Sequence, residues 1–170
     1  VAETTGVGKV TVTTGGVVST GPSGTGISTN AVLGATVITV NGPVLADGSG
    51  ITAFSTSGNI TIAANNKVTG TTGDGIVAVT NGAGDVTIST TNPLAPVLGG
   101  GGDGIRADTD DGIITVNSDG NVSGVANGIN TLNGTGATII NNTAIVQGNT
   151  SGISAFSTTG TISIQNKAGL

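Results

Sequence analysis

The 170-residue sequence contains no cysteine, histidine, methionine, tryptophan or tyrosine, and only two phenylalanines. Without cysteine and histidine, the chain can form no disulfide, no Cys/His metal site and no histidine-dependent catalytic triad. Charged residues make up 8% of the chain, against about a quarter in an ordinary soluble domain. The four cations are scattered among nine acids. A nucleic acid is therefore a poor partner for this chain.

The residues that are abundant favour strands and turns. Glycine accounts for 32 residues, and most of the rest is threonine, serine, asparagine, valine, isoleucine and alanine. Because helix formers are scarce, we expect almost no helix. A chain with little charge and much glycine can be disordered, but here isoleucine and valine recur periodically and the mean hydropathy is positive. No apolar run approaches the roughly 20 residues of a membrane-spanning helix.

A Gly-Ile pair recurs along the chain at intervals of 24, 25, 29, 24 and 24 residues. The pairs are Gly26-Ile27, Gly50-Ile51, Gly75-Ile76, Gly104-Ile105, Gly128-Ile129 and Gly152-Ile153. A small residue follows two positions after each isoleucine: Thr29, Ala53, Ala78, Ala107, Thr131 and Ala155. Such a fixed period is typical of repeat architectures, in which each unit buries its apolar face against its neighbours.

Each repeat also holds an alternating triplet and then a single valine. The triplets are VTV (10–12), ITV (38–40), ITI (60–62), VTI (86–88), ITV (114–116) and ISI (162–164), and valines follow several of them at Val44, Val68, Val122 and Val146. Three short strands per repeat, bounded by Gly, Asn or Asp, predict one coil of a solenoid. We therefore expect an all-β fold, a right-handed single-stranded parallel β-helix of about 6–7 coils of roughly 24 residues.

Several local features follow from this prediction. We expect the glycine before each isoleucine to adopt a positive φ at a corner where a Cβ would clash. The paired asparagines at 65–66 and 141–142 suit corners, where they would tolerate left-handed conformations and form ladders between coils. An outward column is expected at Thr11, Thr39, Thr61, Thr87, Thr115 and Ser163. Threonine is an ordinary outward strand residue; the alternative is an ice-binding surface, for which the neighbouring residues are irregular.

We expect residues 1–170 to form one β-helix segment whose two ends are cut in mid-coil. The chain begins near one triplet and stops just after another. The longest insertion, TTNPLAPVLGGGGDG at 90–104, accounts for the interval of 29 residues. Its two prolines cannot join a β-ladder. We expect it to project as a loop, and loops often carry function.

Two blocks of the sequence are nearly identical. ITAFSTSGNITI (51–62) and ISAFSTTGTISI (153–164) match at eight of twelve positions, so Phe54 and Phe156 occupy equivalent places. Each phenylalanine either fills a corner against its neighbours or forms a small exposed apolar contact. Val79 and Leu132 hold the same position in other coils, which allows an apolar column along the rod.

Two longer stretches carry a family resemblance. VTGTTGDGIVAVTNGAGDVTI (68–88) and GDGIRADTDDGIITVNSDGNVSG (102–124) resemble the passenger domains of Gram-negative autotransporters, and most of all the Gly/Thr/Asn-rich repeats of large surface adhesins. Filamentous adhesins and phage depolymerases use similar coils. The resemblance covers nearly the whole chain.

The resemblance implies a secreted, extracellular rod at the bacterial cell surface. Such a rod serves adhesion, aggregation or host interaction, and it reaches the outer membrane only through a C-terminal barrel, which is absent from these residues. The implied partner is a protein or glycan of a host or neighbouring cell, or further copies of the chain. Protease and lipase motifs are absent from the sequence, so the resemblance carries over no catalytic residue and we expect no enzyme activity.

Four acids cluster in GGDGIRADTDDG, namely Asp103, Asp108, Asp110 and Asp111. Carboxylates of this kind bind Ca²⁺ through oxygen ligands, or serve a polysaccharide lyase or hydrolase, or form a solvated acidic corner that Arg106 partly neutralises. DTDDG lacks the D-x-D-x-DG register, and GGGGDG misses the GGxGxD repeat by one residue. Ca²⁺ is the only cofactor that the sequence suggests.

Three functions are therefore open. The first is an adhesive extracellular rod that provides reach, rigidity and surface contact. The second is a polysaccharide depolymerase or lyase that uses the carboxylates of 103–111. The third is a self-assembling fibre subunit, because uncapped solenoid ends present open strand edges that can stack on one another.

Overall fold

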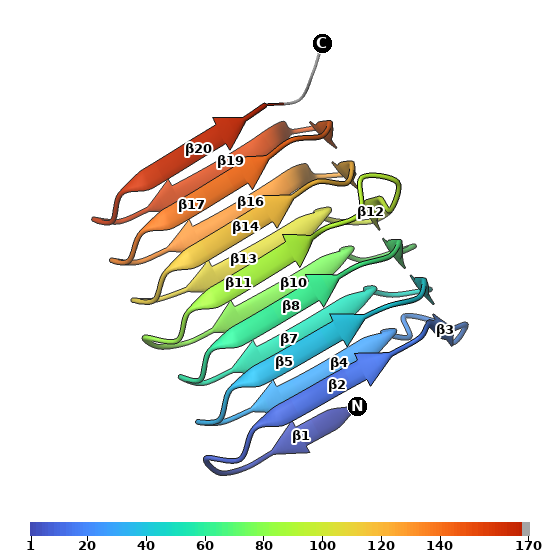
Figure 1. Cartoon of the computed structure of the whole chain (residues 1–170), viewed down its shortest axis with the longest axis horizontal. Coiled ribbons are helices and arrows are strands. Elements are labelled where there is room, and N and C mark those ends of the chain that lie inside the picture. The colour runs from blue at the N-terminus through green and yellow to red at the C-terminus, as the bar shows by residue number, and fades with distance from the viewer. Residues whose placement is uncertain (168–170) are drawn as a thin grey trace.

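The computed structural model describes residues 1–167, in which twenty β-strands and no helix wind into a parallel β-solenoid of about seven turns (Figure 1). Three sheets run along the rod: sheets A and B have seven strands each and sheet C has six. The strands β1 and β20 lie at opposite ends of the stack. The predicted all-β architecture, its parallel stacking and its repeat of about 24 residues are confirmed. Within residues 1–167 we find no helix able to cross a membrane.

Each complete coil contributes one strand to each sheet. Sheet A consists of β1 (Ala2–Thr4), β4 (Ile27–Ala31), β7 (Ile51–Ser55), β10 (Ile76–Thr80), β13 (Ile105–Thr109), β16 (Asn127–Asn133) and β19 (Ser151–Ser157). Sheet B consists of β2 (Val10–Thr14), β5 (Thr36–Val40), β8 (Ile60–Ala64), β11 (Val86–Thr90), β14 (Ile114–Ser118), β17 (Thr138–Asn142) and β20 (Ile162–Asn166). Sheet C consists of β3 (Val17–Ser19), β6 (Val44–Ala46), β9 (Val68–Gly70), β12 (Val97–Gly99), β15 (Val122–Gly124) and β18 (Val146–Gly148).

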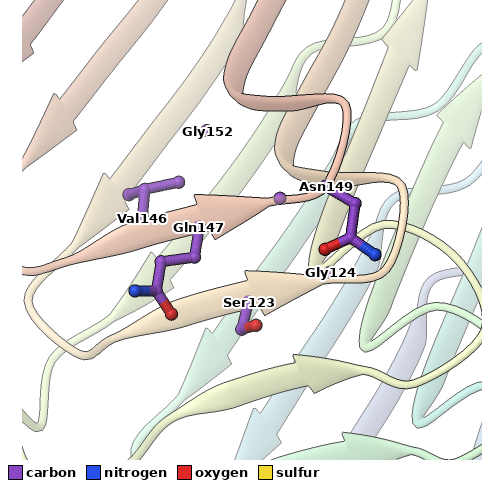
Figure 2. Close-up of a pocket in the computed structure, with 7 residues that line it drawn as sticks. Ser123, Gly124, Val146, Gln147, Asn149 and Gly152 are labelled. Carbon is purple, nitrogen blue, oxygen red and sulfur yellow. The ribbon is translucent and has the colours of Figure 1, made fainter.

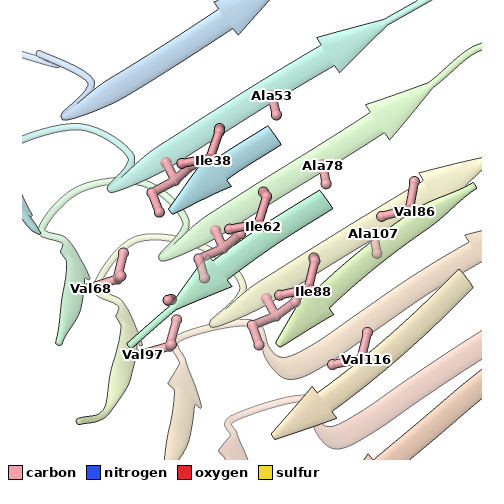
Figure 3. Packing of buried hydrophobic residues seen from close by; sticks show 14 of the residues in the cluster. Ile38, Ala53, Ile62, Val68, Ala78, Val86, Ile88, Val97, Ala107 and Val116 are labelled. Atoms are coloured by element: carbon pink, nitrogen blue, oxygen red, sulfur yellow. The ribbon is translucent and has the colours of Figure 1, made fainter. Parts of the chain in front are cut away.

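The core is a set of residue columns that run from coil to coil. Sheet A supplies the isoleucines of the Gly-Ile pairs, and sheet C supplies the valines that open its strands. Figure 3 shows a row of larger side chains from sheet B, Ile38, Ile62 and Ile88, beside the small Ala53 and Ala78 of sheet A. The small column of sheet A makes room for the isoleucines of sheet B. Each isoleucine that is buried in this way stabilises the fold by about 1.5–3 kcal/mol.

One coil is offset from the register that the triplets predicted. Val10 and Ile60 both pair with Thr36 rather than with Ile38. Thr36 is therefore buried, and its hydroxyl has no hydrogen-bond partner within residues 1–167. The outward column is Thr11, Val37, Thr61, Thr87, Thr115, Ile139 and Ser163. The placement of Thr39 in this column was wrong. Val37 and Ile139 interrupt the threonines, so the regular surface on which ice binding would depend is absent from this column.

Glycine recurs before isoleucine in this chain because the coils pack closely there, and not because the backbone is left-handed. Among the described glycines, only Gly16 has a positive φ, of 155°, so the predicted positive φ is wrong for the Gly-Ile pairs. The predicted clash is right: a Cβ on Gly50 would lie 2.6 Å from the carbonyl oxygen of Gly75 and 2.6 Å from Cγ1 of Val68. Corners of adjacent coils approach so closely that no side chain fits between them.

The insertion is shorter than the sequence indicated. Val97–Gly99 forms β12 and pairs in register with β9 and β15, so residues 90–104 are not one loop. The projecting part is 91–96, seen beside the β12 label in Figure 1. Asn92 closes it, because its Oδ1 accepts the N–H of Leu94 (3.0 Å). Leu94 at the tip is 89% exposed.

Asparagines form ladders between coils, as predicted. Asn65 Nδ2 donates to Asn41 Oδ1 (3.0 Å), and Asn141 Nδ2 donates to Asn117 Oδ1 (2.9 Å). The expected left-handed backbone is wrong, because Ser23 (φ 60°) is the only non-glycine residue with a positive φ in the described chain. The side-chain ladders therefore form without a left-handed backbone.

Side chains also close the corner between sheets A and B. In four coils, a hydroxyl or amide oxygen accepts the N–H of a glycine three residues later, a local bond that favours a turn over continued strand. The pairs are Ser55 with Gly58, Thr109 with Gly112, Asn133 with Gly136 and Ser157 with Gly160. Since these residues end their strands, the same bond sets where each coil turns.

We expect Ile114→Asp to unfold several coils. Ile114 is fully buried between Val86 and Thr138 of the adjacent coils, and a buried carboxylate without a partner destabilises a fold by about 4 kcal/mol or more. Thermal unfolding followed by circular dichroism should show the loss of the cooperative transition. The matched control is Thr115→Asp, whose side chain points outward. An unchanged melting curve for Ile114→Asp would contradict the continuous core.

We expect Gly75→Ala to lower the free energy of unfolding by about 1–3 kcal/mol, the usual effect of overpacking. The added Cβ would lie 2.5 Å from the Gly104 carbonyl oxygen. The control is Gly15→Ala, because nothing lies within 4 Å of its Cβ position. Chemical denaturation of both variants measures the difference, and equal stabilities would disprove the close-packing explanation.

Candidate functional site

The outer face of sheet A carries an outward-facing column that crosses seven coils. Its members pair in register and are Glu3, Asn30, Phe54, Val79, Asp108, Leu132 and Phe156. Phe54, Leu132 and Phe156 are 45%, 50% and 58% exposed. The two phenylalanines therefore lie on strands with their side chains open to solvent, in the column shared with Val79 and Leu132. Their part in binding stays a prediction.

An ion pair interrupts the apolar column at its centre. Arg106 and Asp108 lie two residues apart on β13, and Arg106 donates from Nε (2.9 Å) and Nη2 (2.7 Å) to Asp108 Oδ2. This hydrogen bonding raises the pKa of Arg106. Asp108 is buried while the Arg106 side chain stays 46% exposed. The centre of the face is thus polar but close to neutral.

A shallow hollow of about 390 Å³ lies over β10, β13 and β16 at the corner toward sheet B. We name it the sheet A hollow. Val79 and Leu132 give it apolar surface, and Arg106, Asp108 and Asp110 give it charge. These residues come from three coils, so only the stacking of the solenoid brings them together.

The four predicted acids do not gather round one point. Asp103 is buried, and its carboxylate accepts hydrogen bonds from the N–H and Nδ2 of Asn127 (2.9 and 2.8 Å) and from Asn130 Nδ2 (2.9 Å). Asp111 accepts the hydroxyl of Thr135 (2.8 Å), and Asp110 is exposed. Across residues 1–167, no group of three or more acids is placed to hold a metal ion. Ca²⁺ binding stays a prediction without a common site.

Asp74 is a neighbour of this group that the sequence interpretation missed. Each side chain at this corner accepts the N–H of the next coil: Ser49 from Asp74 (3.3 Å), Asp74 from Asp103 (2.6 Å), and Asp103 from Asn127 (2.9 Å). The repeated GDGI at 73–76 and 102–105 is the signal that could have found it. Burial raises the pKa of Asp74, and the charges of Asp103 and Asp108 add to this.

A second hollow, of about 440 Å³, lies against β15 and β18 on sheet C. Figure 2 shows Ser123 and Gln147 on these neighbouring strands, with Asn149 on the turn that follows. All seven of its lining residues are uncharged, and four of them are Val146 and glycines. This hollow lies along the edge strand β18, and its lining offers no charged side chain for catalysis or ion binding.

Compared with known proteins, the sequence matches no family model, no curated protein and no solved structure.

We expect Asp74→Asn to raise the melting temperature at pH 7. The folded-state pKa of Asp74 lies above its ordinary value of 3.8, so the unfolded chain loses this proton at a lower pH than the folded chain does. The free energy of unfolding therefore falls as the pH rises from 3.8 through the folded-state pKa. An asparagine keeps the oxygen that accepts the Asp103 N–H and removes the half-buried charge. The gain should disappear below pH 3.8.

Melting curves from pH 3 to 8 test this expectation, with Asp110→Asn as the control at an exposed carboxylate. A lower melting temperature of Asp74→Asn at pH 7 would mean that the ionised form of Asp74 stabilises the corner.

Proposed function

We propose that this chain is part of an extracellular, structural and adhesive rod of a secreted bacterial surface protein, of the autotransporter-passenger or filamentous-adhesin type. The observation that supports the proposal best is an unbroken solenoid that carries its exposed phenylalanines and Leu132 in a single column. A rod repeats its surface at every coil of about 4.8 Å, so contacts along one face add together.

The chemistry of the chain favours contact over catalysis. The acids that a lyase would need are engaged separately: Asp103 by Asn127, Asp108 by Arg106, and Asp111 by Thr135. Aromatic residues are typical of the centres of binding surfaces, and the only two of this chain, Phe54 and Phe156, both lie in the exposed column. Continuous backbone ladders between coils supply the stiffness that an extended surface rod requires.

Beads coated with the folded chain test the proposal. We expect them to attach to epithelial or bacterial cells, and the double variant Phe54→Ser/Phe156→Ser to reduce attachment at least about fivefold, the effect of losing more than 1 kcal/mol at a contact. Leu45→Ser is the matched control, because Leu45 is similarly exposed on sheet C (47%).

Two outcomes would overturn the proposal. One is the absence of attachment by beads that carry the folded chain. The other is release of reducing ends from polysaccharides, abolished by Asp108→Ala, which would favour the depolymerase.

A further inference from the structure

We propose that the sheet A hollow binds an uncharged oligosaccharide that lies across the strands, along the column from Phe54 to Phe156. The inference rests on the proposed adhesive function and names the chemistry of its partner. Three properties of the outer face of sheet A lead to it: size, arrangement of polar groups and charge.

The dimensions of the face fit a narrow ligand. Phe54 and Phe156 lie four coils apart in register, which corresponds to roughly 20 Å at about 4.8 Å per coil. Strands of five residues make the face roughly 17 Å wide. A stable protein partner needs about 800 Å² on each side, about twice what this face offers. A hollow of about 390 Å³ is within the usual range for small ligands.

The polar and apolar groups alternate as a sugar requires. A pyranose presents a C–H face and a rim of hydroxyls, and each hydroxyl both donates and accepts hydrogen bonds. Val79 and Leu132 offer apolar surface on either side of β13. Between them, Asp108 Oδ1 accepts no hydrogen bond from residues 1–167, because Arg106 uses Oδ2 alone. The half-exposed guanidinium of Arg106 keeps further N–H donors for a ligand.

Phe54 and Phe156 extend the apolar surface at the two ends of the column. Aromatic rings offer flat, rigid contact area to the C–H face of a sugar. Because one pyranose in an extended chain is close in length to the distance between adjacent coils, about 4.8 Å, successive sugars would meet successive side chains of the column. The ligand would therefore contact several coils, in agreement with a hollow whose lining residues come from four successive coils.

Charge selects against acidic glycans. Among the described residues, Arg106 is the only cation that lines the hollow, and Asp108 already neutralises it. Asp110 adds an unbalanced negative charge at the rim, and the whole chain carries a net charge of −5. Sulfated chains and uronic acids are therefore repelled, while hydroxyl-rich neutral sugars find carboxylate acceptors and guanidinium donors.

The test is a binding titration of the folded chain by saturation-transfer NMR and calorimetry. The probes are uncharged tetrasaccharides of glucose, galactose and mannose, with heparin-derived and oligogalacturonate tetrasaccharides as anionic comparators. We expect at least one neutral probe to bind, and Leu132→Ser and Arg106→Gln each to weaken it at least about tenfold. Leu45→Ser on sheet C should bind as the unchanged chain does. Unchanged melting temperatures show that each variant is folded.

The outcomes separate this inference from the proposed function. Stronger binding of the anionic probes overturns the inference, as does neutral binding that Leu132→Ser leaves unaltered. If no probe binds while coated beads still attach to cells, the oligosaccharide inference fails and the adhesive rod stands. If neither binding nor attachment occurs, both fail.

Discussion

The whole structure depends on one constraint: the backbone of each coil bonds to the backbones of the coils above and below it in strict register. Ile27, Ile51 and Ile76 succeed one another in sheet A because their strands pair residue for residue. In a parallel ladder, a shift by one residue would turn every inward side chain outward. Repetition of the apolar pattern therefore fixes the pairing, and the pairing in turn stacks like residues into columns.

Columns have different requirements on the two faces of each strand. Inward columns must fill a narrow prism, so large and small residues alternate between sheets, as Ile62 does with Ala53 and Ala78. Corners leave no room for a Cβ where Gly50 approaches Gly75. Outward columns have no such limits. They accept Phe54, Val79, Asp108 and Leu132 in succession.

Several of the few charged side chains of this chain are paired with a neighbouring group. Asp74 and Asp103 each cap the N–H of the next coil, and Arg106 pairs with the nearest acid on its own strand. A buried acceptor needs a donor, and at this corner the backbone N–H of the adjacent coil supplies it. Polar atoms without a partner in the next coil lie over β13, where the half-exposed Arg106 pairs with the mostly buried Asp108 between apolar neighbours.

The sequence by itself determined the architecture. A recurring Gly-Ile pair, with a small residue two positions on, suffices to predict stacked coils, because burial of a periodic apolar face is a local property of each repeat. The tertiary structure decided the rest. Thr36 rather than Ile38 begins the inward face of β5, since pairing with two neighbouring coils overrides the local triplet. The glycines of the Gly-Ile pairs are required because the backbone of the next coil lies so close to them. The four acids of 103–111 separate because successive side chains of a strand face opposite ways and corners redirect the chain. The hollow over Val79, Arg106 and Leu132 joins residues that are about 25 positions apart in the sequence. These residues become neighbours only because adjacent coils stack on one another.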